Sequence, residues 1–321
     1  MTVGFNSCRP LGRAENITAV WEAFDGDKEF HGGAKGMGGF VNVGRWPENV
    51  IVTDEFVFDK RPEQIVVMIA HGLTGGKKYG RDQARGIFKR SPDGCERTNY
   101  YIVSSEYGRQ FAASAAGIPL GRCLPLGMPR TDRYIGAVKG EGKTPLRGYT
   151  SYLYAPTFRA RYDPPREPID WERIDSILRD DELMVVKRHM NSPCEIVGKR
   201  LDHVIEVPAI KPSAGYIIDC DVLVTDFSSI MFDAMMLRKP VVLVSDSNDS
   251  YLETRGMYMP YPDGYSSRWI LPSGNEEAFV EMLREAAANG QREADLLCLE
   301  RVAGACDGHS AERVAEFVSQ L

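Results

Sequence analysis

The sequence predicts an α/β protein built from two doubly wound domains with parallel sheets. Short apolar runs alternate with helical patterns along the 321 residues, and a polar stretch with four glycines, Gly136–Tyr149, separates two halves of this pattern. Alternating strand and helix patterns are typical of βαβ units, which build parallel sheets. We therefore expect an N-terminal domain over residues 1–140 and a C-terminal domain over residues 149–321, with a terminal helix that is able to pack back on the first domain.

In the N-terminal half, the strands are predicted from apolar runs and the helices from apolar residues at helical spacing. The predicted strands are Val3–Phe5, Val50–Thr53, Ile65–Ala70, Tyr100–Val103 and Arg122–Leu126. The predicted helices are Ile17–Phe24, Arg81–Phe88 and Gly108–Ala116. We expect the glycine-rich segment His31–Gly39 to be a loop.

The same criteria predict a second set of strands and helices in the C-terminal half. The predicted strands are Tyr152–Ala155, Leu183–Lys187, His203–Glu206, Val222–Thr225, Val241–Ser245 and Trp269–Leu271. The predicted helices are Asp170–Leu178, Ile230–Leu237, Glu276–Ala287 and Ser310–Gln320. In open α/β sheets ligands bind beyond the carboxyl ends of the strands, so polar residues that follow these strands are the candidates for a site.

Composition excludes several classes of protein. With 43% hydrophobic and 26% charged residues, the chain is typical of soluble globular proteins. It has neither an apolar run of ~18 residues nor the apolar core of a signal peptide, which predicts a cytoplasmic location. The seven cysteines are scattered without a CxxC pair, which favours reduced thiols over disulfides or a zinc site. The net charge of −6 disfavours nucleic acid as a partner.

The segment Asp221–Val244 combines a strand, a polar turn, a helix and a second strand. The helix is expected to end before Lys239-Pro240, because proline cannot continue a helix. Ser228 and Ser229 stand at the strand-to-helix junction, where hydroxyls cap the helix and exposed amides attract anions. Taken alone, the segment is also compatible with an ordinary capped helix.

Two polar clusters follow strands of the N-terminal half. In HGLTGGKKYG, His71 and Gly72 precede Lys77 and Lys78, a pattern compatible with a general base beside a phosphate-binding loop or with a structural histidine. In LGMPRTDRY, a Gly-x-Pro turn precedes Arg130 and Asp132, which could form a fixed ion pair.

Two more clusters follow strands of the C-terminal half. In YAPTFRARY, Thr157 and Arg159 follow the strand, and arginine can grip phosphate with two hydrogen bonds. In VVKRHM, Lys187 and His189 share one face of an extended segment, because side chains alternate with period two.

Motifs for other chemistry are absent from the sequence. It contains no Walker GxxxxGK[ST], GxGxxG, HExxH or GxSxG pattern and no carboxylate pair of the kind that glycosidases use. Metal and nicotinamide chemistry are therefore poorly supported, and we expect no cofactor and no metal. The basic stretch Lys77–Arg97 is either a solvated helix face or a surface that binds an anionic membrane or a phosphate-rich acceptor.

Taken in order, these clusters resemble the CDP-glycerol:poly(glycerophosphate) glycerophosphotransferase family, which contains teichoic-acid primases and polymerases. The resemblance covers residues from about 65 to the C-terminus, and the ordered set of motifs is specific although each one alone is weak. The matching segments are His71-Gly72 with Lys77-Lys78, Gly127–Asp132, Tyr154–Arg159, Lys187 with His189, Thr225–Ser229, Phe232-Asp233, Lys239-Pro240 and Tyr251–Tyr258, which contains Arg255. The loop after His71 departs from the family's Thr-Pro-Leu, and Thr131 and Phe227 stand in place of Asn and Tyr.

The resemblance implies a GT-B-like fold, with an acceptor-side first domain and a nucleotide-donor-binding second domain that face a cleft. It implies transfer of a polyol phosphate, glycerol phosphate in the first place, from a CDP-activated donor to a hydroxyl of a glycan, a polyol-phosphate polymer or a lipid-linked acceptor, with release of CMP and without a metal. His71 would be the general base, and His189 and Lys187 would stabilise the leaving CMP.

The remaining residues receive supporting roles from the same resemblance. Residues on the donor side would hold its phosphates or ribose: Thr157, Arg159, Thr225, Asp226, Ser228, Ser229 and Asp233. Residues on the acceptor side would bind the acceptor or support the fold: Gly72, Lys77, Lys78, Arg130, Asp132 and Arg255. Such an enzyme would work in the cytoplasm or at the inner face of the membrane.

Two alternatives stay open from the residues. A GT-B glycosyltransferase that uses a nucleotide sugar would have the same fold and a different donor. A non-catalytic protein that binds polyanions through the basic stretch would retain binding after loss of His71 and His189. Release of CMP or UDP from the corresponding donors separates the first two activities.

Overall fold

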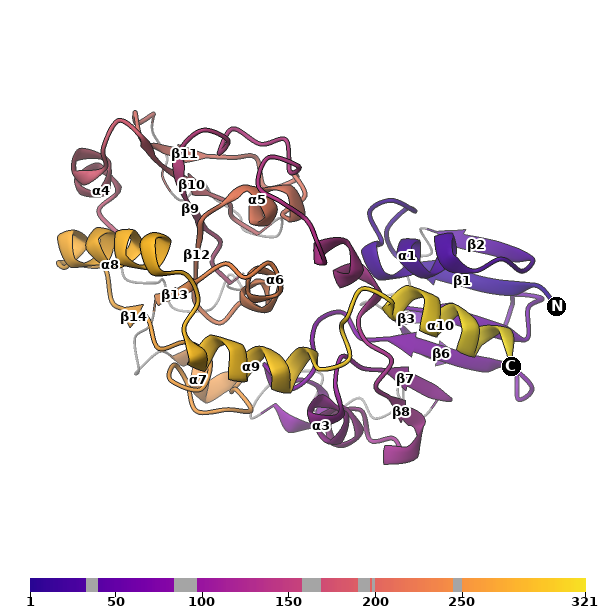
Figure 1. Cartoon of the computed structure of the whole chain (residues 1–321). Coiled ribbons are helices and arrows are strands. Elements are labelled where there is room, and N and C mark those ends of the chain that lie inside the picture. Colours follow the sequence, from indigo (N-terminus) through magenta and orange to yellow (C-terminus); the bar gives the residue numbers. More distant parts are fainter. Residues whose placement is uncertain (33–39, 84–96, 158–168, 190–196, 198–199, 245–249) are drawn as a thin grey trace. The chain divides into compact units, whose positions relative to one another are not determined.

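A computed structural model describes residues 1–32, 40–83, 97–157, 169–189, 197, 200–244 and 250–321 (Figure 1). The chain divides into two compact units. Unit 1 contains Met1–Ile135, Thr254–Tyr258 and Glu300–Leu321, and unit 2 contains Gly136–Glu253 and Met259–Leu299. Each unit has its own parallel sheet.

These units differ in extent from the domains expected from the sequence. Two segments from the second half of the chain, Thr254–Tyr258 and Glu300–Leu321, belong to unit 1. The first is held by backbone hydrogen bonds, from Lys78 N to Gly256 O at 3.1 Å and from Tyr258 N to Gly76 O at 2.9 Å. The second carries helix α10 (Ser310–Ser319), which packs on helix α1 (Glu15–Ala23).

The sheet of unit 1 has six parallel strands. Their spatial order is β2 (Lys28–Gly32), β1 (Val3–Ser7), β4 (Val50–Thr53), β6 (Ile65–Ile69), β7 (Tyr100–Ile102) and β8 (Cys123–Leu124). The central strands β1 and β4 are buried along their whole length, as expected of parallel strands covered on both faces. The order of the sheet reverses between β1 and β4, which is therefore its topological switch point.

Shorter elements complete unit 1. They are the two-stranded sheet of β3 (Phe40–Asn42) and β5 (Phe56–Asp59), helix α3 (Glu106–Ala116), and the 3₁₀ turns Gly80–Asp82, Leu120–Arg122 and Pro129–Tyr134. The helix expected over Arg81–Phe88 is replaced at its start by the first of these turns, and residues 84–88 lie outside the described residues. Strand β2 includes His31, which the sequence assigned to a loop.

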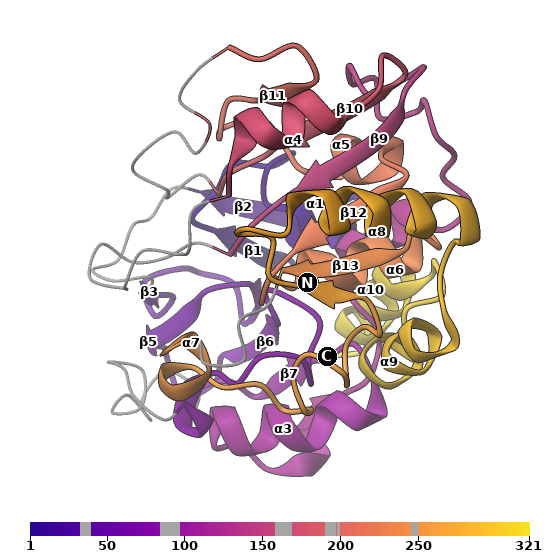
Figure 2. The same ribbon diagram turned by 90° about the vertical axis from the view of Figure 1, so that its left-hand side faces the viewer.

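The sheet of unit 2 also has six parallel strands (Figure 2). Their order is β11 (Val204–Glu206), β10 (Glu182–Val186), β9 (Thr150–Tyr154), β12 (Val222–Thr225), β13 (Val241–Val244) and β14 (Trp269–Ile270). Numbered within the unit, this order is 3-2-1-4-5-6, that of Rossmann folds. The switch point lies between β9 and β12.

Six helices accompany this sheet in the described chain, two of which run across a boundary between the units. They are α4 (Trp171–Ile177), α5 (Ala214–Asp219), α6 (Ile230–Met236), α7 (Ser250–Thr254), α8 (Glu276–Asn289) and α9 (Glu293–Ala303). Helices α4 and α8 pack together and cover the core formed by Tyr152, Val224 and Phe279.

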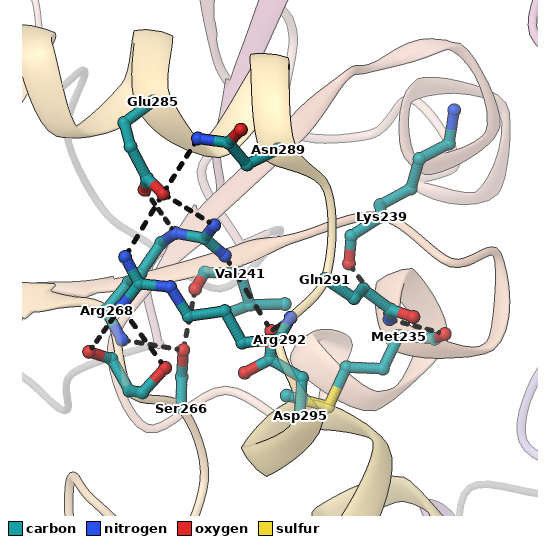
Figure 3. Close-up of polar contacts among 11 residues, drawn as sticks. Met235, Lys239, Val241, Ser266, Arg268, Glu285, Asn289, Gln291, Arg292 and Asp295 are labelled. Atoms are coloured by element: carbon teal, nitrogen blue, oxygen red, sulfur yellow. Dashed lines mark hydrogen bonds and ion pairs between the residues drawn. The ribbon is translucent and has the colours of Figure 1, made fainter.

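A buried arginine joins β13, β14 and helix α8 (Figure 3). The Arg268 side chain is 1% exposed, and its Nε donates to Glu285 Oε2 at 2.7 Å. The Arg268 backbone N–H donates to Ser266 Oγ at 3.2 Å, and that hydroxyl donates to Val241 O at 2.8 Å. Asp295 lies on the other side, with Oδ2 4.0 Å from Arg268 Nη1. This cluster fixes the edge of the sheet in unit 2.

Candidate functional site

In unit 1, His71 begins a loop that follows β6 and is held in place by hydrogen bonds and packing. His71 is exposed, whereas Thr74 and Gly75 are buried. Thr74 N donates to Ser104 Oγ at 2.8 Å, and the two hydroxyls lie 3.0 Å apart. Gly75 has φ +94°, and a Cβ there would lie 3.0 Å from the ring of Tyr107, so a side chain would be strained. The loop therefore holds its first residue, His71, at the carboxyl end of β6.

The end of the same loop is fixed by residues far along the chain. Lys77 forms an isolated antiparallel bridge with Met257, next to the bonds of Lys78 and Gly76 to the same segment. Arg255 precedes Gly256 in this segment and is half-buried. The structure thus brings the backbones of Lys77 and Met257 together, although their positions differ by 180 in sequence.

Asp132 has a structural partner that the sequence did not indicate. Its carboxylate accepts hydrogen bonds from Ser310 N at 3.1 Å and Ala311 N at 2.7 Å, and it therefore caps helix α10. Gly127 has φ +94°, and a Cβ there would lie 2.3 Å from Ser310 Oγ. The Arg130 N–H donates to Asn16 Oδ1 at 2.9 Å. The Gly-x-Pro-Arg turn therefore anchors the terminal helix, and Asp132 holds the first backbone amides of that helix.

In unit 2, the switch point of the sheet carries a buried carboxylate. Asp226 is 1% exposed and follows β12, and its Oδ1 accepts from Thr157 N at 2.6 Å, beyond the end of β9. Thr225 Oγ1 donates to Ala155 O at 2.6 Å. The buried Thr157 Oγ1 has no hydrogen-bond partner in the described part of the chain. Thr157, Thr225 and Asp226 thus lie together at the carboxyl ends of β9 and β12, while Arg159 lies outside the described residues.

Lys187 follows the neighbouring strand β10 and is 5% exposed. Its Nζ donates to the carbonyl oxygens of Ala209 at 3.0 Å and Arg188 at 3.2 Å. Burial lowers the pKa of this ammonium, and the charge of Arg188 lowers it further. His189 is exposed. The sequence missed Arg188, whose Nε lies 3.1 Å from Glu206 Oε1 on the neighbouring strand β11.

Ser228 and Ser229 precede helix α6 and use their backbone carbonyls for the first turn. Met231 N donates to Ser228 O and Phe232 N to Ser229 O, both at 3.2 Å. Neither hydroxyl makes a hydrogen bond to any described residue, so the side-chain cap expected from the sequence is not formed at Ser229. Asp233 is 4% exposed on the same helix. The two hydroxyls thus lie half-buried at the carboxyl edge of the sheet with their hydrogen-bonding capacity unused.

Sequence reasoning missed one residue near His71. Asp54 follows β4, is 8% exposed, and its Oδ2 accepts from Ser7 Oγ at 3.3 Å. Burial raises the pKa of its carboxyl, while the charge of His71 acts in the opposite direction. An acid directly after a buried parallel strand is the signal that could have found it.

The described residues contain neither a candidate metal-binding cluster nor a helix able to cross a membrane. Within these residues, no three or more His, Cys, Asp or Glu side chains are grouped so that they could hold a metal ion. Likewise, the helices of the described chain are all too short or too polar to cross a membrane.

The chain is similar in sequence to enzymes of teichoic acid synthesis. A teichoic acid poly(ribitol-phosphate) polymerase of Bacillus spizizenii is 29% identical over 217 residues, which cover 62% of this chain and 35% of the relative. A teichoic acid ribitol-phosphate primase of the same organism is 25% identical over 299 residues, which cover 85% and 75%. The chain therefore spans between 35% and 75% of the length of these two relatives.

The solved structure of the wall teichoic acid polymerase TagF superposes with a TM-score of 0.75 at 17% identity, covering 99% of this chain and 88% of that one. This likeness confirms the predicted fold class, GT-B with two Rossmann-type parallel-sheet domains. The model of one protein family matches residues 46–320, nearly the whole chain. The chain thus belongs to the CDP-Glycerol:Poly(glycerophosphate) glycerophosphotransferase family, as its ordered motifs predicted.

Proposed function

We propose that this protein transfers a polyol phosphate from a CDP-activated donor to a hydroxyl group of an acceptor and releases CMP. Family membership and the relatives, which are ribitol-phosphate enzymes, support this class of reaction. A variant of TagF has been solved after soaking with CDPG, so a member of the same fold takes this compound. Glycerol phosphate and ribitol phosphate are the two candidate groups.

The observation that carries the proposal is the polar cluster at the switch point of unit 2. Asp226 holds the backbone of Thr157 at 2.6 Å, and the hydroxyls of Thr157, Ser228 and Ser229 make no hydrogen bond to any described residue. A phosphate offers several acceptor oxygens, so these hydroxyls can donate to it. Ligands bind at this point of doubly wound sheets. We therefore assign the donor's phosphates to this edge, with Arg159 as an additional cation.

The residues that follow β10 stabilise the negative charge that develops on the leaving CMP. The acceptor's hydroxyl oxygen attacks the phosphorus of the polyol phosphate, the bond from that phosphorus to the bridging oxygen breaks, and CMP leaves with an additional negative charge. Lys187 and His189 stabilise this charge, and phosphoryl transfer depends mainly on such positioning and charge stabilisation. Burial makes the ammonium of Lys187 electrostatically stronger than it would be in water. Asp226 and Asp233 order the loop or bind the ribose.

Unit 1 supplies the base. His71 takes the proton of the attacking hydroxyl, because a neutral imidazole can accept a proton near pH 7. Lys77, Lys78 and Arg255, fixed by the bridge to Met257, bind the anionic groups of the acceptor, which we place at the inner face of a membrane. Arg130, Asp132 and Gly72 support this side. In this mechanism cationic side chains do the work, and neither a metal nor another cofactor takes part.

Donor specificity tests the proposal. The full chain is incubated with CDP-glycerol, CDP-ribitol, UDP-glucose and UDP-N-acetylglucosamine, each with a glycan, a polyol-phosphate oligomer and a lipid-linked glycan as acceptors. Release of CMP together with elongation of one acceptor is expected. Release of UDP without CMP would overturn the proposal and identify a glycosyltransferase. Acceptor binding that survives both His71→Ala and His189→Ala, without any turnover, would instead identify a polyanion-binding protein.

A further inference from the structure

The switch point of unit 1 carries a second polar cluster. Strand β1 pairs with β4 so that Asn6 lies opposite Thr53, and β4 pairs with β6 so that Thr53 lies opposite Met68. Continued by one residue, this register places Ser7 and Ile69 beside Asp54. His71 is two residues beyond Ile69, and the backbone follows the sheet as far as Ala70, whose N–H donates to Ile102 O at 3.3 Å, before it bends at His71. His71 therefore lies at the same edge of the sheet as Asp54.

The distances allow contact between the two side chains. Adjacent strands lie about 4.8 Å apart and rise about 3.3 Å per residue, which puts the Cα atoms of Asp54 and His71 roughly 8 Å apart. The hydrogen bond from Ser7 Oγ to Asp54 Oδ2, at 3.3 Å, confirms that Asp54 lies at this edge. An imidazole and a carboxylate together span such a gap.

Each of the two side chains has an unused hydrogen-bonding position. Asp54 is 8% exposed, and its Oδ1 is buried without a hydrogen-bond partner among the described residues. His71 makes no hydrogen bond in the described part of the chain. A buried carboxylate oxygen without a partner is costly, so it favours a conformation in which an N–H reaches it. Catalytic hydrogen bonds are often long in unliganded proteins and shorten when substrate binds.

We propose that Asp54 is a positioning residue for His71: its Oδ1 accepts a hydrogen bond from one imidazole nitrogen and thereby leaves the other nitrogen unprotonated and directed at the acceptor hydroxyl. The inference rests on the proposed function, in which His71 is the base. As His71 takes the proton, the Asp54 carboxylate stabilises the imidazolium that forms, and Asp54 itself stays ionised.

Several charged groups act on Asp54 besides His71. Glu55, the next residue, raises the pKa of the Asp54 carboxyl, and Arg9, beyond the end of β1, lowers it. Glu55 is also 8% exposed, but its Oε1 faces Cys8 N at 3.4 Å. Two neighbouring acids of equal burial thus have different partners. Glu55 is therefore a matched control for Asp54.

A measurement that needs no substrate tests the pairing. In protein labelled with ¹⁵N-histidine, the His71 signals are those lost in His71→Gln, and their chemical shifts report which ring nitrogen carries the proton. We expect one dominant tautomer in the wild type, a mixture of both in Asp54→Asn, and one dominant tautomer in Glu55→Gln. Equal tautomer populations in the wild type and Asp54→Asn would overturn the inference.

Turnover tests the role of the pair in the reaction. With the CDP donor and acceptor that the wild type uses, Asp54→Asn is expected to lower kcat at least about 100-fold, with KM for the donor within about threefold, since only the base is misplaced. Glu55→Gln should stay within about threefold of the wild type in both constants. A kcat of Asp54→Asn within about threefold of the wild type would overturn the inference while leaving the proposed function intact.

A different combination of results separates the two proposals. If the wild type releases no CMP from any CDP donor while Asp54→Asn still mixes the tautomers, the proposed function falls and the pairing of the two side chains stands. Thermal unfolding of Asp54→Asn controls for misfolding. We expect its melting temperature to equal or exceed that of the wild type, since the neutral amide keeps the shape and removes a buried charge.

Discussion

Two buried aspartates, one in each unit, both have a carboxyl pKa raised by burial, but they differ in the side chain that lies near the carboxylate. Asp295 in unit 2 is 0% exposed and Asp54 in unit 1 is 8% exposed, and burial raises the pKa of both carboxyls. The cation near Asp295 is the 1% exposed guanidinium of Arg268, which is always charged and is also held by Glu285. The charge near Asp54 is that of the exposed His71 side chain, which lowers the pKa of the Asp54 carboxyl.

The difference separates a structural pair from one available for chemistry. A buried guanidinium between two carboxylates can neither exchange its proton near neutral pH nor meet a substrate, so its role is to hold β13, β14 and α8 together. An exposed imidazole near a buried carboxylate can exchange a proton near neutral pH and can also contact a substrate. Burial of a carboxylate alone therefore does not identify a functional site in this fold. The exposure and chemistry of its partner do.

The largest expected effect is on turnover. His71→Gln should lower kcat by about 10²–10⁴-fold, the range typical of a lost general base, and leave the melting temperature unchanged because the side chain is exposed. CMP release and differential scanning calorimetry measure the two quantities. His309→Gln is the control, since His309 is an exposed histidine of the same unit that pairs with Glu312. Equal activity of the two variants would remove the distinction between Asp54 and Asp295.

For the structural pair of Arg268 and Asp295, we expect an effect on stability rather than on turnover. Arg268→Met leaves Asp295 without its cation and should lower the free energy of unfolding by about 3–5 kcal/mol. Arg292→Ala is the control, since its guanidinium is 45% exposed and contacts the same Glu285, and it should lose less than about 1 kcal/mol. Urea unfolding followed by circular dichroism measures both. Equal losses in the two variants would show that burial of Arg268 does not matter.

Donor binding should depend on the unpartnered serine hydroxyls of unit 2. The double variant Ser228→Ala, Ser229→Ala should raise KM for the CDP donor by about 5- to 10-fold, as expected from about 0.5–1.5 kcal/mol per net hydrogen bond with incomplete additivity. Its stability should not change, because neither hydroxyl caps helix α6. Ser176→Ala, whose hydroxyl donates to Arg173 O in the same unit, should leave KM unchanged. An unaltered KM in the double variant would place the donor elsewhere.

The smallest effect is the pH dependence of stability. A carboxyl whose pKa is raised by folding binds its proton more tightly in the native state, so its contribution to stability is present at low pH and is lost as pH rises through the folded pKa. Asp54→Asn should therefore gain stability relative to the wild type as pH rises above 3.8, the ordinary pKa of an aspartate. Unfolding curves at several pH values test this sign. A relative loss of stability with rising pH would contradict the pKa direction of Asp54.

The sequence predicted the sheet strands well where both faces are buried. Runs such as Val50–Thr53 and Val222–Thr225 are continuous apolar segments, which is what parallel strands covered on both faces require. Strand β2, KEFHG, was missed because it lies at the edge of its sheet and has no apolar run. The attachment of Thr254–Tyr258 to unit 1 could not be predicted from local patterns, because it depends on backbone hydrogen bonds to Gly76 and Lys78, far along the chain.

For the site residues too, those with a local sequence signal could be predicted, and those that depend on distant parts of the chain could not. Thr157 could be singled out because it follows an apolar strand, and Asp226 was singled out through the family motif; the structure joins the two by a hydrogen bond. The burial of Lys187 could not, since it depends on carbonyl oxygens supplied by Ala209, far along the chain. Asp54 was missed because its relation to His71 depends on the pairing of β4 with β6, which brings the ends of these two strands together.

The central claim is that a CDP-activated polyol phosphate is transferred intact to a hydroxyl. Phosphorus-31 NMR of the full chain with CDP-glycerol or CDP-ribitol and an acceptor tests it directly. We predict that the pyrophosphate signals disappear while equal amounts of CMP and a new phosphodiester appear, and that His71→Gln suppresses both products. Pyrophosphate signals that persist with every acceptor, or that convert to CMP and free polyol phosphate, would contradict it.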